Sequence, residues 1–446
     1  MSGAESVNGA SRFIVRPGRR FGGVAIVPGD KSISHRALLL GAIANGLTEI
    51  NGFLASEDCR ATLAALRAMG AAIDEQAPDR LRVSGLGLNG LQRPPGPLDL
   101  GNSGTAMRLL IGLMAGQDFS TELTGDESLC RRPMERVAAP LREMGAEIDT
   151  TNGKPPVCIK GKTKLSGIDY RLPLASAQVK SAVLLAALYA QGQTRVIEPA
   201  VTRDHTERML PAFGVPVTHG ERTAAIDGPA RLTGARIDVP GDLSSAAFLL
   251  GAAFLSERDP VTIERVGINP TRTGVLAILG LMGAEIRTEN HTTMGNEPVA
   301  SLIGLPSALT GATIPPELVP LAIDEFPLIF ALAACAKGET RVTGAAELRH
   351  KESDRIAVMI QALRKLGIDA EESADGARIA GGRPCGGTVD SHDDHRVAMA
   401  LAVAGMMATA PVTILNVDNV ATSFPGFVPA MQSLGLDLQY EPGSGK

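Results

Sequence analysis

A repeated pattern constrains the fold of this chain more strongly than any single motif. Six times, a helix-like stretch ends in a glycine that is followed by a short strand-like stretch. Glycine is expected at such helix ends because it adopts the left-handed backbone conformation without steric strain. The sequence therefore predicts six copies of one unit of about 70 residues, marked by Gly70, Gly145, Gly214, Gly283, Gly367 and Gly435.

Each copy also contains an apolar run that follows a short polar segment. The runs are apolar on all sides, which indicates helices that are buried on every face. A strand-like piece follows most runs, and a second, amphipathic helix then leads to the marker glycine. This alternation predicts an α/β fold (α+β in some schemes), with buried helices over 37–44, 109–115, 182–190, 246–255, 327–336 and 397–408.

Chain length and a repeated tetrapeptide predict two domains. A chain of 446 residues is too long for one core, so the six copies divide naturally into two sets of three. Val239-Pro240-Gly241-Asp242 echoes Val27-Pro28-Gly29-Asp30, and both segments stand where the chain would enter a domain. If the buried helices of each domain are parallel, their polar starts gather at one end. We therefore expect an active site in the cleft between the domains.

Composition narrows the classes of function. Aromatic residues make up 3% of the chain and tryptophan is absent, which argues against base stacking and nucleic-acid binding. The net charge of −5 provides no general attraction for polyanions, so an anion site has to be built locally. The five cysteines are scattered without a C-x-x-C pair, and neither a signal peptide nor a membrane-spanning run is recognisable. We therefore expect a cytoplasmic protein without a disulfide framework or a membrane segment.

The polar segments before the buried helices differ in chemistry, which a purely structural repeat would not require. They supply cations, hydroxyls, amides and carboxylates at helix starts, where the backbone carries partial positive charge and favours anions. Ser32 or Ser34 is expected to cap the first of these helices. The segments are Asp30–Arg36, Asn102–Arg108, Ser176–Lys180, Asp242–Ser245, Asp324-Glu325 and Asp393–Arg396.

Further charged residues precede the outer helices or flank the last segment. Lys351 and Arg355 are four residues apart, so a helix would place them on one face, although a solvated helix start is the simpler interpretation of this segment alone. His392 and His395 flank two aspartates, but no third ligand cluster accompanies them. Helix capping is therefore favoured over metal binding, and we expect neither a metal nor a cofactor.

Eight segments occur in order along the chain: PGDKSISHRALLL (28–40), GNSGTAMRLL (101–110), RRPMERV (131–137), ASAQVKSA (175–182), TRDHTE (202–207), IDEFP (323–327), KESDR (351–355) and DDHRVAM (393–399). Taken together, these segments resemble the EPSP synthase (5-enolpyruvylshikimate-3-phosphate synthase) family of enolpyruvyl transferases. The resemblance implies two similar domains, 29–240 and 1–28 plus 241–446. Each would contain three βαβαββ units around buried parallel helices, an inside-out α/β barrel type.

The resemblance also implies a reaction. Members of this family transfer the enolpyruvyl group of phosphoenolpyruvate to the 5-hydroxyl of shikimate 3-phosphate by addition and elimination, which releases phosphate. The product leads to chorismate and the aromatic amino acids. Both substrates are polyanions, which explains the cations at the helix starts. The implied partners are these two small molecules, bound by a monomer whose domains close on them.

Likeness to the family assigns roles to individual residues. Catalysis is assigned to Asp324, Glu352 and Lys31, with the two carboxylates as an acid/base pair. The residues expected to bind shikimate 3-phosphate are Lys31, Ser32, Arg36, Ser176, Ala177, Arg203, Asp324 and Lys351. The residues expected to bind phosphoenolpyruvate are Lys31, Gly104, Arg132, Gln178, Arg355 and Arg396.

Two positions give conflicting expectations about the inhibitor glyphosate. Thr422 stands where many relatives have a lysine, which resembles the divergent class that includes glyphosate-insensitive enzymes. Gly104 instead resembles the sensitive form. A second departure from the family pattern is Ala177, which lacks a hydroxyl that many relatives place there.

Two other functions stay open at this level. The sister transferase that acts on UDP-N-acetylglucosamine has a Lys-Asn pair where this chain has Lys31-Ser32. It also has a reactive loop cysteine, whose spacing and surroundings Cys130 does not match. A non-catalytic sugar-phosphate-binding relative would gain little from carboxylates such as Asp324 and Glu352 beside its arginines.

Overall fold

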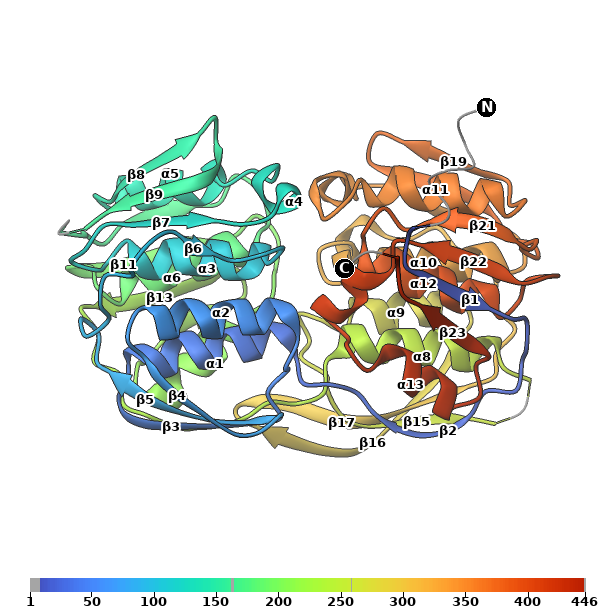
Figure 1. Cartoon of the computed structure of the whole chain (residues 1–446), viewed down its shortest axis with the longest axis horizontal. Helices are drawn as coiled ribbons and strands as arrows, with labels where there is room; N and C mark the ends of the chain where they lie inside the picture. Colours follow the sequence, from blue (N-terminus) through green and yellow to red (C-terminus); the bar gives the residue numbers. More distant parts are fainter. Residues whose placement is uncertain (1–8, 162–163, 258, 445–446) are drawn as a thin grey trace. The chain divides into compact units, whose positions relative to one another are not determined.

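The computed structural model describes residues 9–161, 164–257 and 259–444. The chain divides into two compact units, each described by itself below. Of the described residues, the N-terminal unit comprises those within 29–240 together with 293–297, and the C-terminal unit comprises those within 9–28, 241–292 and 298–444. Both units combine buried helices with four- or three-stranded sheets (Figure 1). The predicted α/β fold is therefore confirmed.

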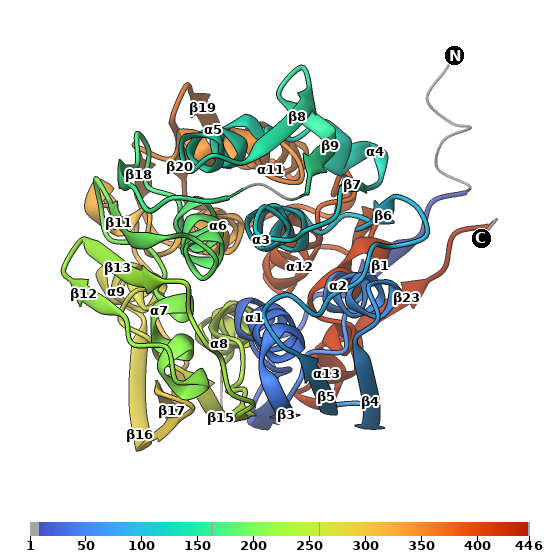
Figure 2. The same cartoon turned by 90° about the vertical axis from the view of Figure 1, so that its left-hand side faces the viewer.

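Buried helices form the centre of the N-terminal unit, and Figure 2 shows them nearly end-on. Their apolar side chains are inaccessible to solvent all round, as Leu39, Leu110 and Leu184 illustrate. Helices that are apolar on every face need cover on every face, which sheets and outer helices provide. Each begins before its apolar run, because the polar segment forms its first turn. These helices are α1 (Lys31–Ile43), α3 (Gly104–Met114) and α6 (Ala177–Ala187).

The sheets of this unit share one strand order. In the sheet β6-β7-β9-β8, the first pair is parallel and the other pairs are antiparallel. The buried helix α3 connects the parallel pair, since parallel strands need a crossover. The sheets are β14 (Arg236–Asp238), β3 (Asn45–Asn51), β5 (Arg80–Leu86), β4 (Ala72–Ala77); β6 (Leu98–Asp99), β7 (Thr121–Thr124), β9 (Lys154–Lys160), β8 (Glu147–Thr151); and β10 (Asp169–Arg171), β11 (Gly192–Ile197), β13 (Thr223–Gly228), β12 (Thr218–Gly220).

The outer helices end at the marker glycines. The backbone angle φ of these glycines is positive in every copy, between 81° at Gly367 and 109° at Gly435, which confirms the predicted left-handed helix ends. The outer helices of the N-terminal unit are α2 (Glu57–Ala68), α5 (Glu135–Glu143) and the short α7 (His205–Met209), which continues as a 3-10 turn over Leu210–Phe213; the one-turn α4 (Glu127–Cys130) precedes α5.

The C-terminal unit repeats this plan. Its buried helices are α8 (Leu243–Leu255), α10 (Phe326–Cys335) and α12 (His395–Gly405), and its outer helices are α9 (Gly274–Leu281), α11 (Arg355–Lys365) and α13 (Phe427–Ser433). Its sheets are β16 (Glu285–Met294), β17 (Glu297–Leu305), β15 (Val261–Gly267), β2 (Gly23–Ile26); β18 (Glu339–Val342), β20 (Gly376–Ala380), β19 (Ala370–Ser373); and β21 (Gly387–Asp390), β22 (Val412–Leu415), β1 (Arg12–Val15), β23 (Leu438–Glu441). Short 3-10 turns cover Pro316–Leu318, Ile323–Glu325, Ala346–His350 and Asp418–Thr422.

Strands from the start of the chain complete the C-terminal unit. β1 lies between β22 and β23, and β2 pairs in parallel with β15. The two Val-Pro-Gly-Asp segments stand where the chain passes between units. The Asp30 N–H donates to the Pro240 carbonyl at 2.8 Å, and the Asp242 N–H donates to the Pro28 carbonyl at 2.9 Å. The echo in sequence therefore corresponds to two segments that bond to each other. Within the described residues, no helix is long and apolar enough to cross a membrane.

Candidate active site

The start of α1 presents the first predicted site residues. Its N-cap is Asp30, whose carboxylate accepts a backbone N–H three residues on at 2.9 Å. The prediction that Ser32 or Ser34 caps this helix is wrong, because the helix begins at Lys31 and both serines lie inside its first turn. The Lys31 ammonium lies 2.9 Å from Asp58 Oδ2, and the two side chains are 15% and 10% exposed. The helix start therefore combines a partly exposed cation with first-turn N–H groups.

The Arg36 guanidinium lies deeper in the same helix and is buried. It donates to the Ser32 carbonyl at 2.9 Å, to Ser181 Oγ at 2.7 Å and to Thr206 Oγ1 at 2.7 Å. Burial lowers the pKa of Arg36 to about 10, against the opposing effect of the Glu207 carboxylate. Arg36 therefore stays charged at neutral pH and links α1, α6 and α7.

Two guanidinium groups surround Gly104 at the start of α3. A Cβ atom at Gly104 would lie 3.0 Å from Arg132 Nη1 and 3.1 Å from Arg108 Nη1. Arg108 Nη1 donates to Gln178 Oε1 at 2.5 Å, and Gln178 Nε2 donates to Thr105 Oγ1 at 3.0 Å. The structure therefore brings together Gly104, Arg132 and Gln178, which the family resemblance assigns to one ligand, phosphoenolpyruvate.

The start of α6 carries the segment that resembles a phosphate motif. Ser176 is its N-cap, and the Ser176 hydroxyl accepts the Val179 N–H at 3.4 Å. Ala177 is the first helical residue. A helix start of this kind favours phosphate through its N–H groups and dipole. Arg203 is partly exposed in the segment that precedes α7.

Arg355 is the centre of the predicted site residues in the C-terminal unit. Its side chain is 1% exposed, with Nε 2.8 Å from Asp394 Oδ2 and Nη2 2.6 Å from Glu352 Oε2. Its Nη1 lies 3.4 Å from Asp324 Oδ1. Burial by itself lowers the pKa of Arg355, but the surrounding carboxylates raise it above its usual value. The two carboxylates predicted as an acid/base pair therefore contact one permanently charged guanidinium.

Two more cations approach Asp324. Lys351 Nζ lies 3.4 Å from Asp324 Oδ1, and Arg396 Nη1 donates to the Asp324 backbone carbonyl at 3.0 Å. Helix α11 begins at Arg355 with Asp354 as its cap, so the prediction that a helix places Lys351 and Arg355 on one face is wrong. Both side chains still reach the same carboxylate because the chain bends just before the helix.

The predicted site residues of the C-terminal unit thus gather around Arg355, whereas those of the N-terminal unit lie at or near the starts of α1, α3 and α6 and in the segments before α5 and α7. Sequence reasoning missed several of their partners. Arg108 lies one helical turn after Gly104, and this spacing could have predicted that both residues lie on the same face of α3. Asp58 carried no local signal, because it pairs with Lys31 across 27 residues. Asp394 was recognised only as a cap, although it also holds Arg355.

The histidines considered as metal ligands lie in different surroundings. His395 is buried in the first turn of α12, whereas His392 is exposed with a φ of 51°. Asp394 caps α12 by accepting the N–H groups of the next turn. The capping interpretation is therefore confirmed. In the described part of the chain, no group of three or more histidine, cysteine, aspartate or glutamate residues could hold a metal ion.

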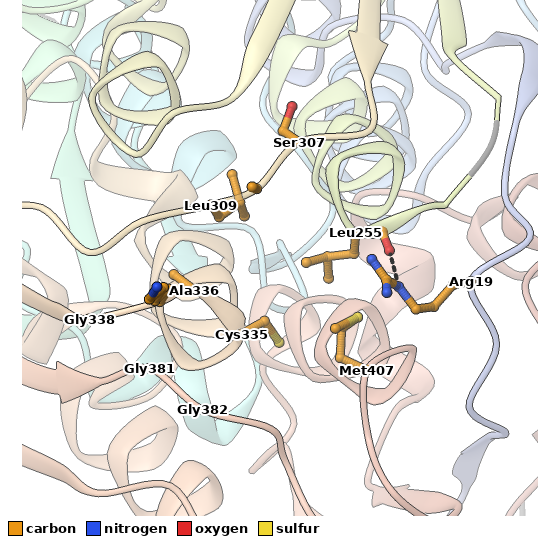
Figure 3. A pocket seen from close by; sticks show the side chains of 12 residues that line it. Arg19, Leu255, Ser307, Leu309, Cys335, Ala336, Gly338, Gly381, Gly382 and Met407 are labelled. Carbon is orange, nitrogen blue, oxygen red and sulfur yellow. Dashed lines mark hydrogen bonds between the residues drawn. The ribbon is translucent and has the colours of Figure 1, made fainter.

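A pocket of 440 Å³ lies in the C-terminal unit at the other ends of the same buried helices (Figure 3). Leu255, Cys335 and Met407, at or just beyond the ends of α8, α10 and α12, line it. The Arg19 Nε donates to the Leu255 carbonyl at 2.9 Å. Because Arg396 lies in the first turn of α12, this pocket is separate from the cluster around Arg355.

Comparison with known proteins gives one consistent result. The family model described as EPSP synthase (3-phosphoshikimate 1-carboxyvinyltransferase) matches residues 15–431. The chain is 56% identical over 436 residues to the 3-phosphoshikimate 1-carboxyvinyltransferase of Alkalilimnicola ehrlichii, covering 97% of this chain and 98% of the relative. It is 56% identical over 428 residues to that of Methylococcus capsulatus, covering 96% and 98%.

The solved structures that match this chain belong to the same family as these relatives. The structure of EPSP synthase from Acinetobacter baumannii matches with a TM-score of 0.86 and 49% sequence identity, covering 97% of this chain and 100% of that one. A second structure from the same organism matches with a TM-score of 0.85 and 48% identity. The matches extend through both units and cover the relatives almost from end to end. This chain therefore belongs to the EPSP synthase family.

Proposed function

We propose that this chain transfers the enolpyruvyl group of phosphoenolpyruvate to the 5-hydroxyl of shikimate 3-phosphate and releases phosphate, as an enzyme of the shikimate pathway. The observation that carries this proposal is the contact of Arg355 with both Glu352, at 2.6 Å, and Asp324, at 3.4 Å. A cation for the substrate anion thus stands beside two carboxylates that can transfer protons. A protein that only binds anions would be weakened by such carboxylates.

The proposed site for shikimate 3-phosphate combines cations with two helix starts. Its phosphate would meet the starts of α1 and α6, where N–H groups and the helix dipole favour an anion. Asp324 and Lys351 would bind the hydroxyls of the ring. The residues proposed for the phosphate side are Lys31, Ser32, Arg36, Ser176, Ala177 and Arg203.

The proposed site for phosphoenolpyruvate uses residues from both units. Arg132 and Gln178, beside Gly104, would come from the N-terminal unit, and Arg355 and Arg396 from the C-terminal unit. Guanidinium groups suit this ligand because their planar forks bind carboxylate and phosphate with two hydrogen bonds each. Since one small substrate would be held by both units, we propose that catalysis requires them to close on it. Unchanged small-angle scattering on addition of both substrates would contradict this closure.

The proposed chemistry consists of an addition and an elimination. In the addition, C3 of phosphoenolpyruvate gains a proton, and the 5-hydroxyl oxygen loses its proton as it bonds to C2. In the elimination, C3 loses a proton and the C2–phosphate bond breaks, which restores the double bond and releases phosphate. Asp324 and Glu352 would exchange these protons, each acting as acid in one step and base in the other. Lys31 would stabilise the negative charge near the reacting centre.

Phosphate release with different acceptors tests the function. The enzyme is given phosphoenolpyruvate together with either shikimate 3-phosphate or UDP-N-acetylglucosamine. We expect release with shikimate 3-phosphate only, because this chain lacks the Lys-Asn pair of the sister enzyme. Release with UDP-N-acetylglucosamine would indicate the sister activity, and release with neither acceptor would indicate a binding protein. We further propose that the enzyme acts as a cytoplasmic monomer, which sedimentation velocity would test for its oligomeric state.

A further inference from the structure

A lysine that the proposed function does not use lies inside the N-terminal unit. The Lys180 side chain in the first turn of α6 is 2% exposed, and its Nζ lies 2.8 Å from Glu198 Oε2 and 2.7 Å from Glu207 Oε1. The same ammonium donates to the Thr202 carbonyl at 3.4 Å. Burial lowers the pKa of Lys180, but the two carboxylates raise it above its usual value. Lys180 is therefore a charged group at the centre of three acceptors.

The two glutamates stand at the ends of the segment that carries Arg203. We call this segment, residues 198–207, the Arg203 loop. Glu198 directly follows β11 and Glu207 belongs to α7, so the Lys180 ammonium joins both ends of the loop to α6. The glutamate side chains are each 5% exposed. Little solvent is therefore available to replace these contacts.

The same loop and helix also hold the Arg36 guanidinium. Thr206, in the Arg203 loop, accepts from Arg36 Nε, and Ser181, next to Lys180 in α6, accepts from Arg36 Nη2, each at 2.7 Å. The Thr206 hydroxyl in turn donates to Ser181 Oγ at 2.9 Å. Both arginines proposed for shikimate 3-phosphate therefore depend on how the Arg203 loop lies against α6.

Stability alone does not require this buried charge network. Apolar side chains of similar volume usually stabilise a core at least as well as buried ion pairs do. Paired charges, in contrast, hold two elements at a defined distance and direction. We propose that Lys180 is a positioning residue, which through Glu198 and Glu207 holds the Arg203 loop so that Arg203 and Arg36 meet the phosphate of shikimate 3-phosphate. This inference rests on the function proposed for the two arginines.

The test removes all three charges at once. Lys180→Met alone would leave two buried carboxylates without their cation and would endanger folding. The triple variant Lys180→Met/Glu198→Gln/Glu207→Gln is close in volume and neutral. We expect it to fold, with the KM for shikimate 3-phosphate raised about tenfold and with kcat and the KM for phosphoenolpyruvate changed by less than about threefold. The control Lys160→Met/Glu147→Gln removes an exposed pair of the same unit, with side chains 58% and 61% exposed, and should change neither KM.

Each outcome is informative. An unchanged KM for shikimate 3-phosphate in the folded triple variant would overturn the positioning role, and so would an equal rise of both KM values, which indicates general loss of structure. Arg203→Met separates this inference from the proposed function, because an unchanged KM there would show that Arg203 itself does not bind the substrate. If the triple variant does not fold, the single variant Glu198→Gln replaces it in the test, because Lys180 then stays paired with Glu207. Calorimetry should then show binding of shikimate 3-phosphate weakened at least about threefold, and unchanged binding would overturn the proposal.

Discussion

Replacing Arg355 by lysine keeps the positive charge but removes the planar fork that reaches three carboxylates. Arg355 Nε and Nη2 bond to Asp394 at 2.8 and 3.3 Å, and Nη2 also bonds to Glu352 at 2.6 Å. Its Nη1 donates to Asp324 at 3.4 Å. The single ammonium of lysine cannot span these three groups. We expect it to stay with one or two of them and to leave at least one carboxylate without its cation.

The expected loss of stability follows from the burial of this group. Arg355 and Asp394 are 1% and 0% exposed, so water can compensate little for the missing contacts. Hydrogen bonds to charged groups contribute about 1.5–3 kcal/mol each, and breaking a buried ion pair costs about 3–5 kcal/mol. The variant should therefore lose about 3–5 kcal/mol of unfolding free energy. Its kcat/KM for phosphoenolpyruvate should fall at least about 100-fold, because the fork is lost and at least one of the three carboxylates loses its cation.

Urea unfolding and phosphate release at saturating shikimate 3-phosphate measure these two effects. Arg341→Lys is the matched control, since Arg341 pairs with Glu339 on the surface of the same unit, with side chains 61% and 37% exposed. Its unfolding free energy should stay within about 0.5 kcal/mol of the wild type. If Arg355→Lys also stayed within about 1 kcal/mol and kept near-normal kcat/KM, the central role of this guanidinium would be refuted.

Three further predictions concern other residues. Asp324→Asn and Glu352→Gln should each lower kcat about 100-fold or more while phosphoenolpyruvate still binds, and near-full turnover in both would exclude them as the acid/base pair. Gly104→Ala places a methyl group 3.0 Å from Arg132 Nη1, so the KM for phosphoenolpyruvate should rise about tenfold. An unchanged KM would show that the Arg132 guanidinium does not bind this ligand. Burial lowers the pKa of His35 from 6.5 to about 3. Below pH 6.5, His35 therefore binds a proton in the unfolded chain but not in the folded protein. The free energy of unfolding should decrease as the pH is lowered, by about 1.4 kcal/mol per pH unit between about pH 6 and pH 4. Urea unfolding of His35→Gln should lack this part of the pH dependence.

The repeated unit could be predicted from the sequence because its signals are local. An apolar run on all helix faces and a glycine at a helix end each depend on a few neighbouring residues. The structure confirms both, as α10 and the φ of 81° at Gly367 illustrate. The resemblance to one family supplied roles for Asp324 and Glu352, which spacing alone could not assign. The comparisons confirm the family, and the individual roles stay predictions.

Details that depend on one residue of register or on distant contacts could not be predicted. Whether Asp30 or Ser32 caps α1 depends on which residue begins the helix, and several polar candidates stand side by side. The pairing of Lys31 with Asp58 joins positions 27 residues apart, and nothing in either segment indicates the other. The burial of the Lys180 ammonium could not be predicted either, because a lysine near a helix start usually faces solvent.

A crystal structure of the Glu352→Gln variant with both substrates bound is the most direct test of the proposed mechanism. Slow turnover in this variant should preserve the two ligands. We predict hydrogen bonds from Arg203 and the start of α6 to the phosphate of shikimate 3-phosphate, and from Arg132 and Arg355 to phosphoenolpyruvate, so that one ligand is held by both units. Substrates bound to one unit alone, or phosphoenolpyruvate bound away from Arg355, would contradict the mechanism.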